Sequence, residues 1–373
     1  MNKDAPIEVT QSSIVAGSEP GAFSAEELTG DNLVSRALLA NALSARDVVE
    51  RGVSVELVGR SHSVFKVAIA GKPAFFVKQF GPSRGDTDGD PVAEMRALEL
   101  ARTHPSLAGF LPRAWPWNED ASIIATHAYD GVEAWRMDTE GGGDKSVEDA
   151  WSALVEELIP RLAAFHKEMR SAVRQPATAG FSRRLPWPLR LMDTDASPEL
   201  WQTPGIVDLL SHAGSDPRLV SGLRRARGMW REMTVIHGDL KHDNALVGLE
   251  GIIIVDWEMA RIGDATWDLA TLVARFAALR PDAVQWRERD LQAMALLLTT
   301  YSNASGLKIP ALAPRLVHYT GAVLLQMAVQ HESVAQNGDD DQGSAGLLHR
   351  SRQCFAHARK TVDWLIANST DDE

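Results

Sequence analysis

Cysteine is almost absent from this chain, since Cys354 is the single cysteine among 373 residues. One cysteine cannot form an internal disulfide, which excludes a disulfide-stabilised secreted scaffold and fits a reducing compartment. Long apolar runs are missing too, because none approaches the roughly 18 residues that a membrane span requires. The amino terminus shows no basic start followed by an apolar stretch and a small-residue cleavage site. We therefore expect a cytoplasmic protein without a membrane partner.

Positive charge is scarce relative to negative charge: 38 lysines and arginines stand against 50 aspartates and glutamates, a net charge of −12. Nucleic-acid binding relies on basic surface, so this balance argues against a nucleic-acid partner and favours a cationic or basic ligand. Apolar residues make up 45% of the chain and charged residues 24%. A chain of this length and composition can bury a large core and form two lobes.

One short segment carries polar groups at spacings that suit phosphoryl transfer. Residues 237–244 read HGDLKHDN, with Asp239 followed five positions later by Asn244. This order of His, Asp and Asn is the catalytic-loop pattern of enzymes that transfer the γ-phosphoryl group of ATP. We predict that Asp239 accepts the proton of the attacking hydroxyl, or at least orients that hydroxyl.

A second carboxylate follows the apolar run 251–255, where Asp256 begins the sequence DWE. Mg²⁺ prefers oxygen ligands and keeps several waters, so one carboxylate and one amide oxygen from the protein are sufficient. We predict that Asn244 and Asp256 are these ligands, with Glu258 as a further candidate. Each piece alone also fits an ordinary turn and a buried strand that ends at a capping Asp. The joint spacing favours the metal and base interpretation.

These residues, with Gly263-Asp264 and Trp267-Asp268 just after them, resemble the aminoglycoside phosphotransferase and choline kinase family. The likeness is specific in this block and continues, more weakly, across most of residues 50–365. The resemblance implies an α+β, bilobal protein kinase-like fold, with a small antiparallel-sheet amino-terminal lobe and a mainly helical carboxy-terminal lobe. It also implies ATP and Mg²⁺ as cofactors and a hydroxyl-bearing acceptor.

Three short β-rich runs, 53–58, 64–69 and 74–78, are separated by glycine-containing turns and predict an antiparallel sheet. In the resembled family the turn after the first strand covers the nucleotide phosphates. That comparison makes Ser61, His62 and Ser63 nucleotide-binding candidates. The turn has a single glycine, so an ordinary connection between strands is the alternative.

Lys78 lies near the end of the third run and is the candidate for the lysine that binds the α- and β-phosphates, with Lys66 and Lys72 as competitors. Asp90, followed by proline, predicts a helix start that places Glu94 in the next helix. An ion pair between Lys78 and Glu94 would hold the lysine on the phosphates. A solvated glutamate on the helix surface is the alternative.

The resemblance places the connector between the lobes after two further predicted strands, 111–117 and 122–126. Backbone groups of Thr126, His127 and Ala128 are therefore expected to hydrogen-bond the adenine of ATP.

We divide the chain into an extension with a helix over 1–52, a nucleotide-binding lobe over 53–131 and a helical lobe over 132–373. Apolar residues at helical spacing predict that the first helix follows Asp31 and that the segment ends at Gly52. His166 lies on an apolar helical stripe and is expected to be a core histidine. Asp264 and Asp268 are expected to cap the helix that starts at residue 266 and to brace the catalytic loop.

Two questions stay open at the level of sequence. Lys241 either neutralises charge on the transferring phosphoryl group or is a surface lysine that points to solvent. The acceptor is either a small molecule of aminoglycoside, amino alcohol or sugar type, or a Ser or Thr hydroxyl of a precursor peptide in lanthipeptide-like biosynthesis. A pseudokinase that binds nucleotide without turnover is a further alternative, which the complete set of predicted side chains disfavours.

Overall fold

The computed structural model describes residues 28–59, 63–80, 90–104, 107, 109–116, 123–129, 131–133, 147–175, 178–193, 204–248, 251–279, 286, 288–335 and 341–369. The chain separates into two compact units. The first unit comprises Met1–Ser83, Gly89–Val132 and Leu246–Glu258, and the second comprises Arg84–Asp88, Glu133–Ala245 and Met259–Glu373. None of the described helices is long and apolar enough to cross a membrane.

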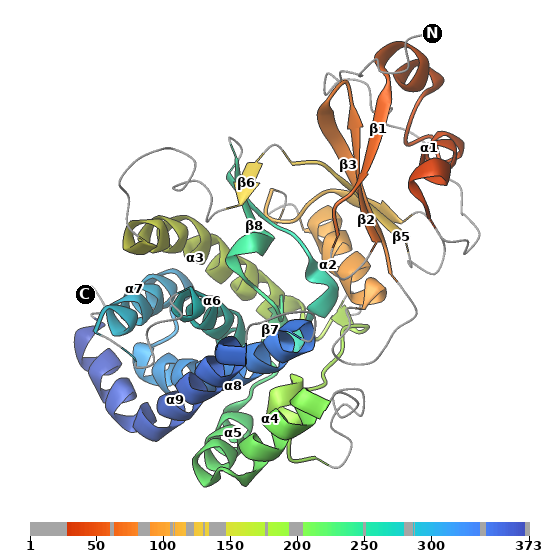
Figure 1. The fold of residues 1–373 in the computed structure, drawn as a ribbon. Coiled ribbons are helices and arrows are strands. Elements are labelled where there is room, and N and C mark those ends of the chain that lie inside the picture. Colours follow the sequence, from red (N-terminus) through yellow and green to blue (C-terminus); the bar gives the residue numbers. More distant parts are fainter. Residues whose placement is uncertain are drawn as a thin grey trace. The chain divides into compact units, whose positions relative to one another are not determined.

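The first unit is built on an antiparallel five-stranded sheet, part of which is labelled in Figure 1. Its spatial strand order is β1-β2-β3-β5-β4. Its strands are β1 (Val53–Leu57), β2 (Ser63–Ile69), β3 (Lys72–Gln79), β4 (Ala114–Pro116) and β5 (Ile123–His127). The helices of this unit are α1 (Gly30–Leu39) and α2 (Pro91–Thr103). A second sheet, of three strands, consists of β6 (Gly131–Glu133), β8 (Ala245–Gly248) and β9 (Gly251–Ile254).

Apolar side chains from α1 and the sheet form the core of the first unit. Leu33 on α1 and Val67 on β2 are fully buried in one cluster, together with Phe65 and Val77. Phe65 lies opposite Val77 in the β2–β3 register. Because side chains alternate between the faces of a strand, Phe65 and Val67 share the face that α1 covers.

The helical pattern predicted between Asp31 and Gly52 is interrupted in the structure. The helix α1 ends at Leu39, and Asn41 adopts a left-handed conformation with φ of 58°. The Ser44 backbone N–H then donates to the Asp47 carboxylate at 2.9 Å, and a separate helical turn, Asp47–Arg51, follows. Asparagine tolerates this conformation, and local bonds from Ser and Asp compete with a continuous helix.

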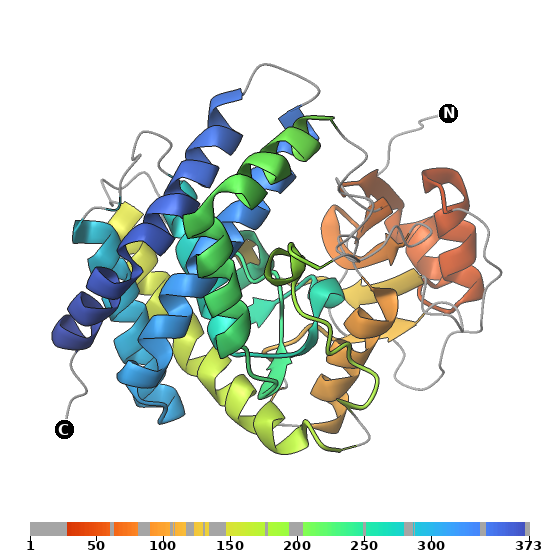
Figure 2. The same cartoon turned by 90° about the horizontal axis from the view of Figure 1, so that it is seen from below.

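The second unit is mainly helical. Its helices are α3 (Val147–Ala172), α4 (Pro204–Ser215), α5 (Pro217–Met229), α6 (Thr266–Ala278), α7 (Glu288–Ser305), α8 (Ile309–Ala335) and α9 (Asp341–Asn368). The long helices α8 and α9 lie side by side, as Figure 2 shows. Strands β7 (Thr234–Ile236) and β10 (Arg261–Gly263) form an antiparallel pair in this unit. The α+β composition predicted from the sequence is therefore confirmed.

Residues 246–258 belong to the first unit, although the predicted boundary after residue 131 placed them in the helical lobe. The reason is strand pairing, because β8 and β9 share a sheet with β6. The Ile254 backbone N–H also donates to the Phe110 carbonyl at 2.9 Å. Asp256 is thus part of the first unit, whereas Asp239 is part of the second.

Candidate functional site

Lys78 is surrounded by three carboxylates in the first unit. Its ammonium group lies 3.0 Å from Glu94 Oε2 and 2.5 Å from Asp256 Oδ1, and it also contacts the Glu258 carboxylate. The side chains of Lys78 and Glu94 are only 12% and 6% exposed. The expected pair of Lys78 and Glu94 therefore forms, and Glu94 is buried rather than solvated. Neither of the competing lysines is placed in this group, since Lys66 pairs with Glu56 on the neighbouring strand and Lys72 starts β3.

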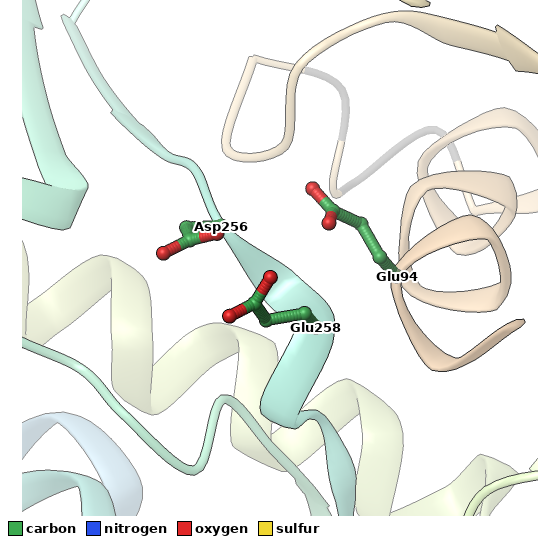
Figure 3. A group of neighbouring side chains, drawn as sticks. All are labelled: Glu94, Asp256 and Glu258. Atoms are coloured by element: carbon green, nitrogen blue, oxygen red, sulfur yellow. The ribbon is translucent and has the colours of Figure 1, made fainter. Parts of the chain in front are cut away.

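The three carboxylates lie near one another and come from two different segments (Figure 3). Glu94 comes from α2, and Asp256 and Glu258 come from the segment after β9. One oxygen atom of each carboxylate lies within 4.8 Å of the others, a spacing at which they could hold a metal ion. Three negative charges around one lysine leave an excess of negative charge, which suits a divalent cation.

The charges in this cluster shift one another's protonation. Burial alone would lower the pKa of Lys78, but the carboxylates of Glu94, Asp256 and Glu258 outweigh it and raise that pKa above its ordinary value. Burial raises the pKa of Glu94, because the favourable charge of Lys78 only partly offsets the loss of water and the repulsion from Asp256. The three carboxylates therefore favour the charged form of Lys78.

Local structure aims Asp256 and Glu258 into the cluster. Asp256 has a φ of 68°, a left-handed conformation that turns the chain sharply after β9. The buried Trp257 side chain anchors this turn, because its indole N–H donates to the Ile254 carbonyl at 2.8 Å. The Asp90 backbone N–H donates to the Glu258 carbonyl at 2.9 Å, which ties the segment to the start of α2. The same Asp90 caps α2, as the sequence predicted.

The loop that carries Asp239 follows β7 in the second unit and is held by its backbone. The buried Asp268 carboxylate accepts the N–H groups of His237 at 2.8 Å and Gly238 at 2.9 Å. The Trp267 indole N–H donates to the Gly238 carbonyl at 3.2 Å. The expectation that Asp268 braces this loop is confirmed, but Asp268 lies inside α6 and does not cap it.

Gly238 must be glycine for two reasons. Its φ is +86°, and an added Cβ atom would lie 2.4 Å from the Met259 carbonyl oxygen. Glycine alone combines this conformation with so close an approach of two backbone segments. The backbone next to Asp239 can therefore adopt this path only because residue 238 has no side chain.

Asn244 is folded back onto the same loop. Its amide nitrogen donates to the backbone carbonyl of Asp239 at 3.1 Å, and its side chain is buried. The amide oxygen is then the end of Asn244 that can serve as a metal ligand. The spacing of five residues between Asp239 and Asn244 thus corresponds to a direct contact in the loop.

Two cations flank Asp239. Lys241 Nζ lies 3.4 Å from Asp239 Oδ2, and an Arg275 guanidinium nitrogen lies 3.5 Å from Asp239 Oδ1. Lys241 therefore faces Asp239 and is not a lysine that points only to solvent. Next to them, the hydrogen bond from His242, at 2.6 Å, lowers the pKa of Asp243 to about 2, with help from Lys241 and Arg275.

Sequence inspection missed Arg275, although one signal for it exists. Arg275 lies seven residues after Asp268 on α6, and residues seven apart share one face of a helix. Because Asp268 contacts the loop that carries Asp239, the same face at Arg275 is directed towards that loop as well.

A buried polar network supports Asp268 from behind. His166 Nε2 lies 3.2 Å from the Asp268 carboxylate, and His166 Nδ1 lies 3.0 Å from the Tyr301 hydroxyl. Both nitrogens of the His166 ring have partners, so His166 is the satisfied core histidine that the sequence predicted. Burial raises the pKa of Tyr301 well above its ordinary value, so its hydroxyl stays neutral.

Asp264 performs the capping role predicted for it. Its carboxylate accepts the backbone N–H of Thr266 at 3.0 Å at the start of α6. Arg315 on α8 donates to the two Asp264 oxygens at 2.9 and 2.8 Å, and the Tyr319 hydroxyl donates at 3.1 Å. The start of α6, which carries Asp268, is thereby tied to α8.

The predicted nucleotide contacts are only partly within the described residues. Ser61 and His62 lie outside them, and Ser63 opens β2 opposite Gln79. The N–H groups of His127 and Ala128 already donate to carbonyls in the same unit, at 2.9 and 3.0 Å. Thr126 pairs with the middle of β3. These two N–H groups are therefore already engaged, and an adenine ring would have to bond to other backbone groups of this segment.

Comparisons with known proteins address the fold and the family. Residues 57–298 match the Phosphotransferase enzyme family, and no curated protein matches the chain. A choline/ethanolamine kinase family protein from Mesorhizobium loti is 17% identical with a TM-score of 0.53, over 90% of this chain and 99% of that one. A putative aminoglycoside phosphotransferase from Ralstonia eutropha JMP134 is 16% identical with a TM-score of 0.51, over 83% and 93%.

A third similar structure is an amicoumacin kinase in complex with AMP-PNP, Ca²⁺ and Ami. It is 12% identical with a TM-score of 0.53, over 90% of this chain and 96% of that one. At such low identities the likeness shows the fold alone. It confirms the predicted protein kinase-like fold.

Proposed function

Because the chain belongs to the Phosphotransferase enzyme family, we propose that it transfers the γ-phosphoryl group of ATP to a hydroxyl group of a small molecule. The observation that supports the proposal is the group formed by Lys78, the buried Glu94 and the partly exposed Asp256. A lysine held by a helix glutamate, next to a metal-binding aspartate, is the phosphate-binding arrangement of kinases. The proposal includes a cytoplasmic location, where ATP is available and a lone buried Cys354 needs no oxidising environment.

The proposed nucleotide site fits Mg²⁺ by the chemistry of its donors. Asp256, Glu258 and the amide oxygen of Asn244 are hard oxygen ligands, which Mg²⁺ prefers. We assign Asp256 and Asn244 to the metal, with Glu258 as an additional oxygen. The metal, when bound, neutralises charge on the phosphates. Lys78 binds the α- and β-phosphates, and Glu94 keeps its ammonium group in place.

Asp239 is the proposed base. In the transfer, the acceptor oxygen forms a bond to the γ-phosphorus while the bond from that phosphorus to the ADP oxygen breaks. The proton of the acceptor hydroxyl passes to the Asp239 carboxylate. Lys241, 3.4 Å from Asp239, supplies positive charge near the transferring group.

The proposed acceptor is a hydroxyl compound of the aminoglycoside, amino alcohol or sugar type. The names of the similar structures refer to choline, ethanolamine, aminoglycosides and amicoumacin, and support a small acceptor. No contact among the described residues favours a precursor peptide over a small molecule. The proposal therefore keeps the small-molecule class alone.

The test is ADP release from Mg-ATP in the presence of choline, ethanolamine, kanamycin, galactose or glycerol, with mass spectrometry of each acceptor. The expected result is the mass gain of one phosphoryl group on at least one acceptor, lost in Asp239→Asn. ATP binding without ADP release, with every acceptor and with water, would instead support a pseudokinase.

A further inference from the structure

Arg275 is the one residue from outside the catalytic loop that the described structure pairs with the Asp239 carboxylate. It belongs to α6, a helix buried along most of its length, and its own side chain is 24% exposed. The guanidinium nitrogen that faces Asp239 at 3.5 Å also donates to Gln330 Oε1 on α8 at 3.2 Å. The Arg275 head group is thus oriented by a second helix.

The two oxygens of Asp239 face two different cations. Oδ2 faces Lys241, which lies in the same loop two residues later and moves with it. Oδ1 faces Arg275, which is anchored in the helical core. Of these two cations, Arg275 is therefore the one that can fix the direction of the carboxylate relative to the body of the second unit. A guanidinium suits this task because it is planar, always charged and offers donors in a fixed geometry.

One face of α6 contacts both the backbone of this loop and the side chain of Asp239. Asp268 binds the backbone N–H groups of His237 and Gly238, and Arg275, two turns later on α6, faces the side chain of Asp239. A side chain with rotatable bonds needs such a second contact, because the backbone bonds alone leave its rotamer free. A small displacement of a reacting group can lower the reaction rate strongly.

We propose that Arg275 is a positioning residue for the reaction, which holds the Asp239 carboxylate in the orientation that accepts the proton of the acceptor hydroxyl. The inference rests on the proposed phosphotransfer function. Gln330 supports the same role one step further away, because it orients the guanidinium. Neither residue needs to contact ATP or the metal, so nucleotide binding is independent of both.

The experiment compares Arg275→Gln, Arg275→Lys and Gln330→Leu with the wild-type enzyme. Turnover is measured as ADP release from Mg-ATP, with the most active acceptor of the panel and with water. We expect kcat to fall about 10- to 100-fold in Arg275→Gln, with the KM for ATP changed less than about twofold. Arg275→Lys recovers part of the loss because it keeps the charge, and Gln330→Leu shows a smaller loss. Arg359→Gln is the matched control, because that arginine is 94% exposed on α9.

A double-mutant cycle separates positioning from a general structural role. If Arg275 acts through Asp239, then Arg275→Gln changes the residual kcat of Asp239→Asn by less than about twofold. An equally large loss in both backgrounds would overturn the inference, as would a wild-type kcat in Arg275→Gln.

Melting curves of the variants serve as the folding control, and unchanged curves exclude a folding defect. If Arg275→Gln does not fold, Arg275→Lys replaces it in the double-mutant cycle. A wild-type enzyme without any ADP release would overturn the proposed function itself, and the inference with it.

Discussion

The carboxylate of Asp268 accepts the backbone N–H of Gly238 at 2.9 Å, thirty residues earlier in the chain. Its other oxygen accepts the N–H of His237, so one buried side chain satisfies two consecutive donors of the loop that carries Asp239. A loop that projects a reactive side chain has few regular backbone partners, and an acidic side chain from a core helix supplies them here.

The first prediction concerns this brace. Asp268→Asn places an amide N–H₂ where an oxygen accepted a backbone N–H, so one buried donor loses its partner. We expect the free energy of unfolding to fall by about 2–4 kcal/mol and turnover to fall with it. Denaturant unfolding of the variant measures the change. Asp363→Asn is the control, because that side chain is 71% exposed, and a wild-type stability of Asp268→Asn would contradict the prediction.

The second prediction concerns Asp239. Asp239→Asn keeps the size of the side chain and removes its ability to accept a proton. Turnover should fall about 10²- to 10⁴-fold, whereas the dissociation constant of ATP should change little, because Asp239 is assigned no nucleotide contact. Calorimetry and a coupled ADP assay measure the two quantities. Asp243→Asn is a control in the same loop, with a half-exposed carboxylate that pairs with His242.

The third prediction distinguishes the lysines of the first unit. Lys78→Met should weaken ATP binding at least about tenfold, because it removes the charge assigned to the phosphates. Lys66→Met should leave ATP binding unchanged, because Lys66 pairs with Glu56 on the neighbouring strand. Fluorescence titration with a labelled ATP analogue measures both affinities. Equal losses in the two variants would refute the assignment of Lys78.

The fourth prediction concerns the metal. Turnover should disappear with EDTA and return with added Mg²⁺. Asp256→Asn should need at least about tenfold more Mg²⁺ for half-maximal turnover, because it removes a charged oxygen ligand. Glu56→Gln is the control, with a side chain that is 62% exposed. A Mg²⁺ dependence that is identical in Asp256→Asn and the wild type would remove Asp256 from the metal site.

The fifth prediction concerns pH. Burial raises the pKa of the Cys354 thiol to about 12. Because this folded-state pKa lies above that of an exposed thiol, the native state favours the protonated form, and the resulting stabilisation is lost as pH rises towards 12. Because burial raises the pKa of this thiol, the native thiol stays protonated at pH 9, so a disulfide reagent should react slowly until denaturant is added. Equal rates with and without denaturant would show that the thiol is accessible.

Local patterns in the sequence were sufficient to predict several residues of the candidate site. Asp239 and Asn244 could be paired because both lie in one short loop, where spacing alone brings them into contact. Glu94 could be placed because Asp90 and the following proline mark the start of a helix. In both cases the informative residues lie close together in the sequence, so the motif spacing was sufficient for the loop and the capping signal for the helix.

Contacts between distant elements could not be predicted in this way. Arg315 reaches Asp264 across 51 residues, and Arg275 reaches Asp239 across 36, and no local pattern states which helix faces meet. The break after α1 depends on one left-handed residue, Asn41, within an otherwise helical pattern. The assignment of residues 246–258 to the first unit depends on strand pairing with β6, which hydrophobic spacing does not reveal.

The bonds from Asp268 have a consequence for hydrogen exchange. Loop amides usually exchange with solvent quickly, because they open without unfolding the surrounding structure. The amides of His237 and Gly238 are buried under α6 and bonded to a carboxylate that His166 and Tyr301 support in turn. Their exchange should require opening of the helical core, so these two loop amides should exchange as slowly as those of α6 itself.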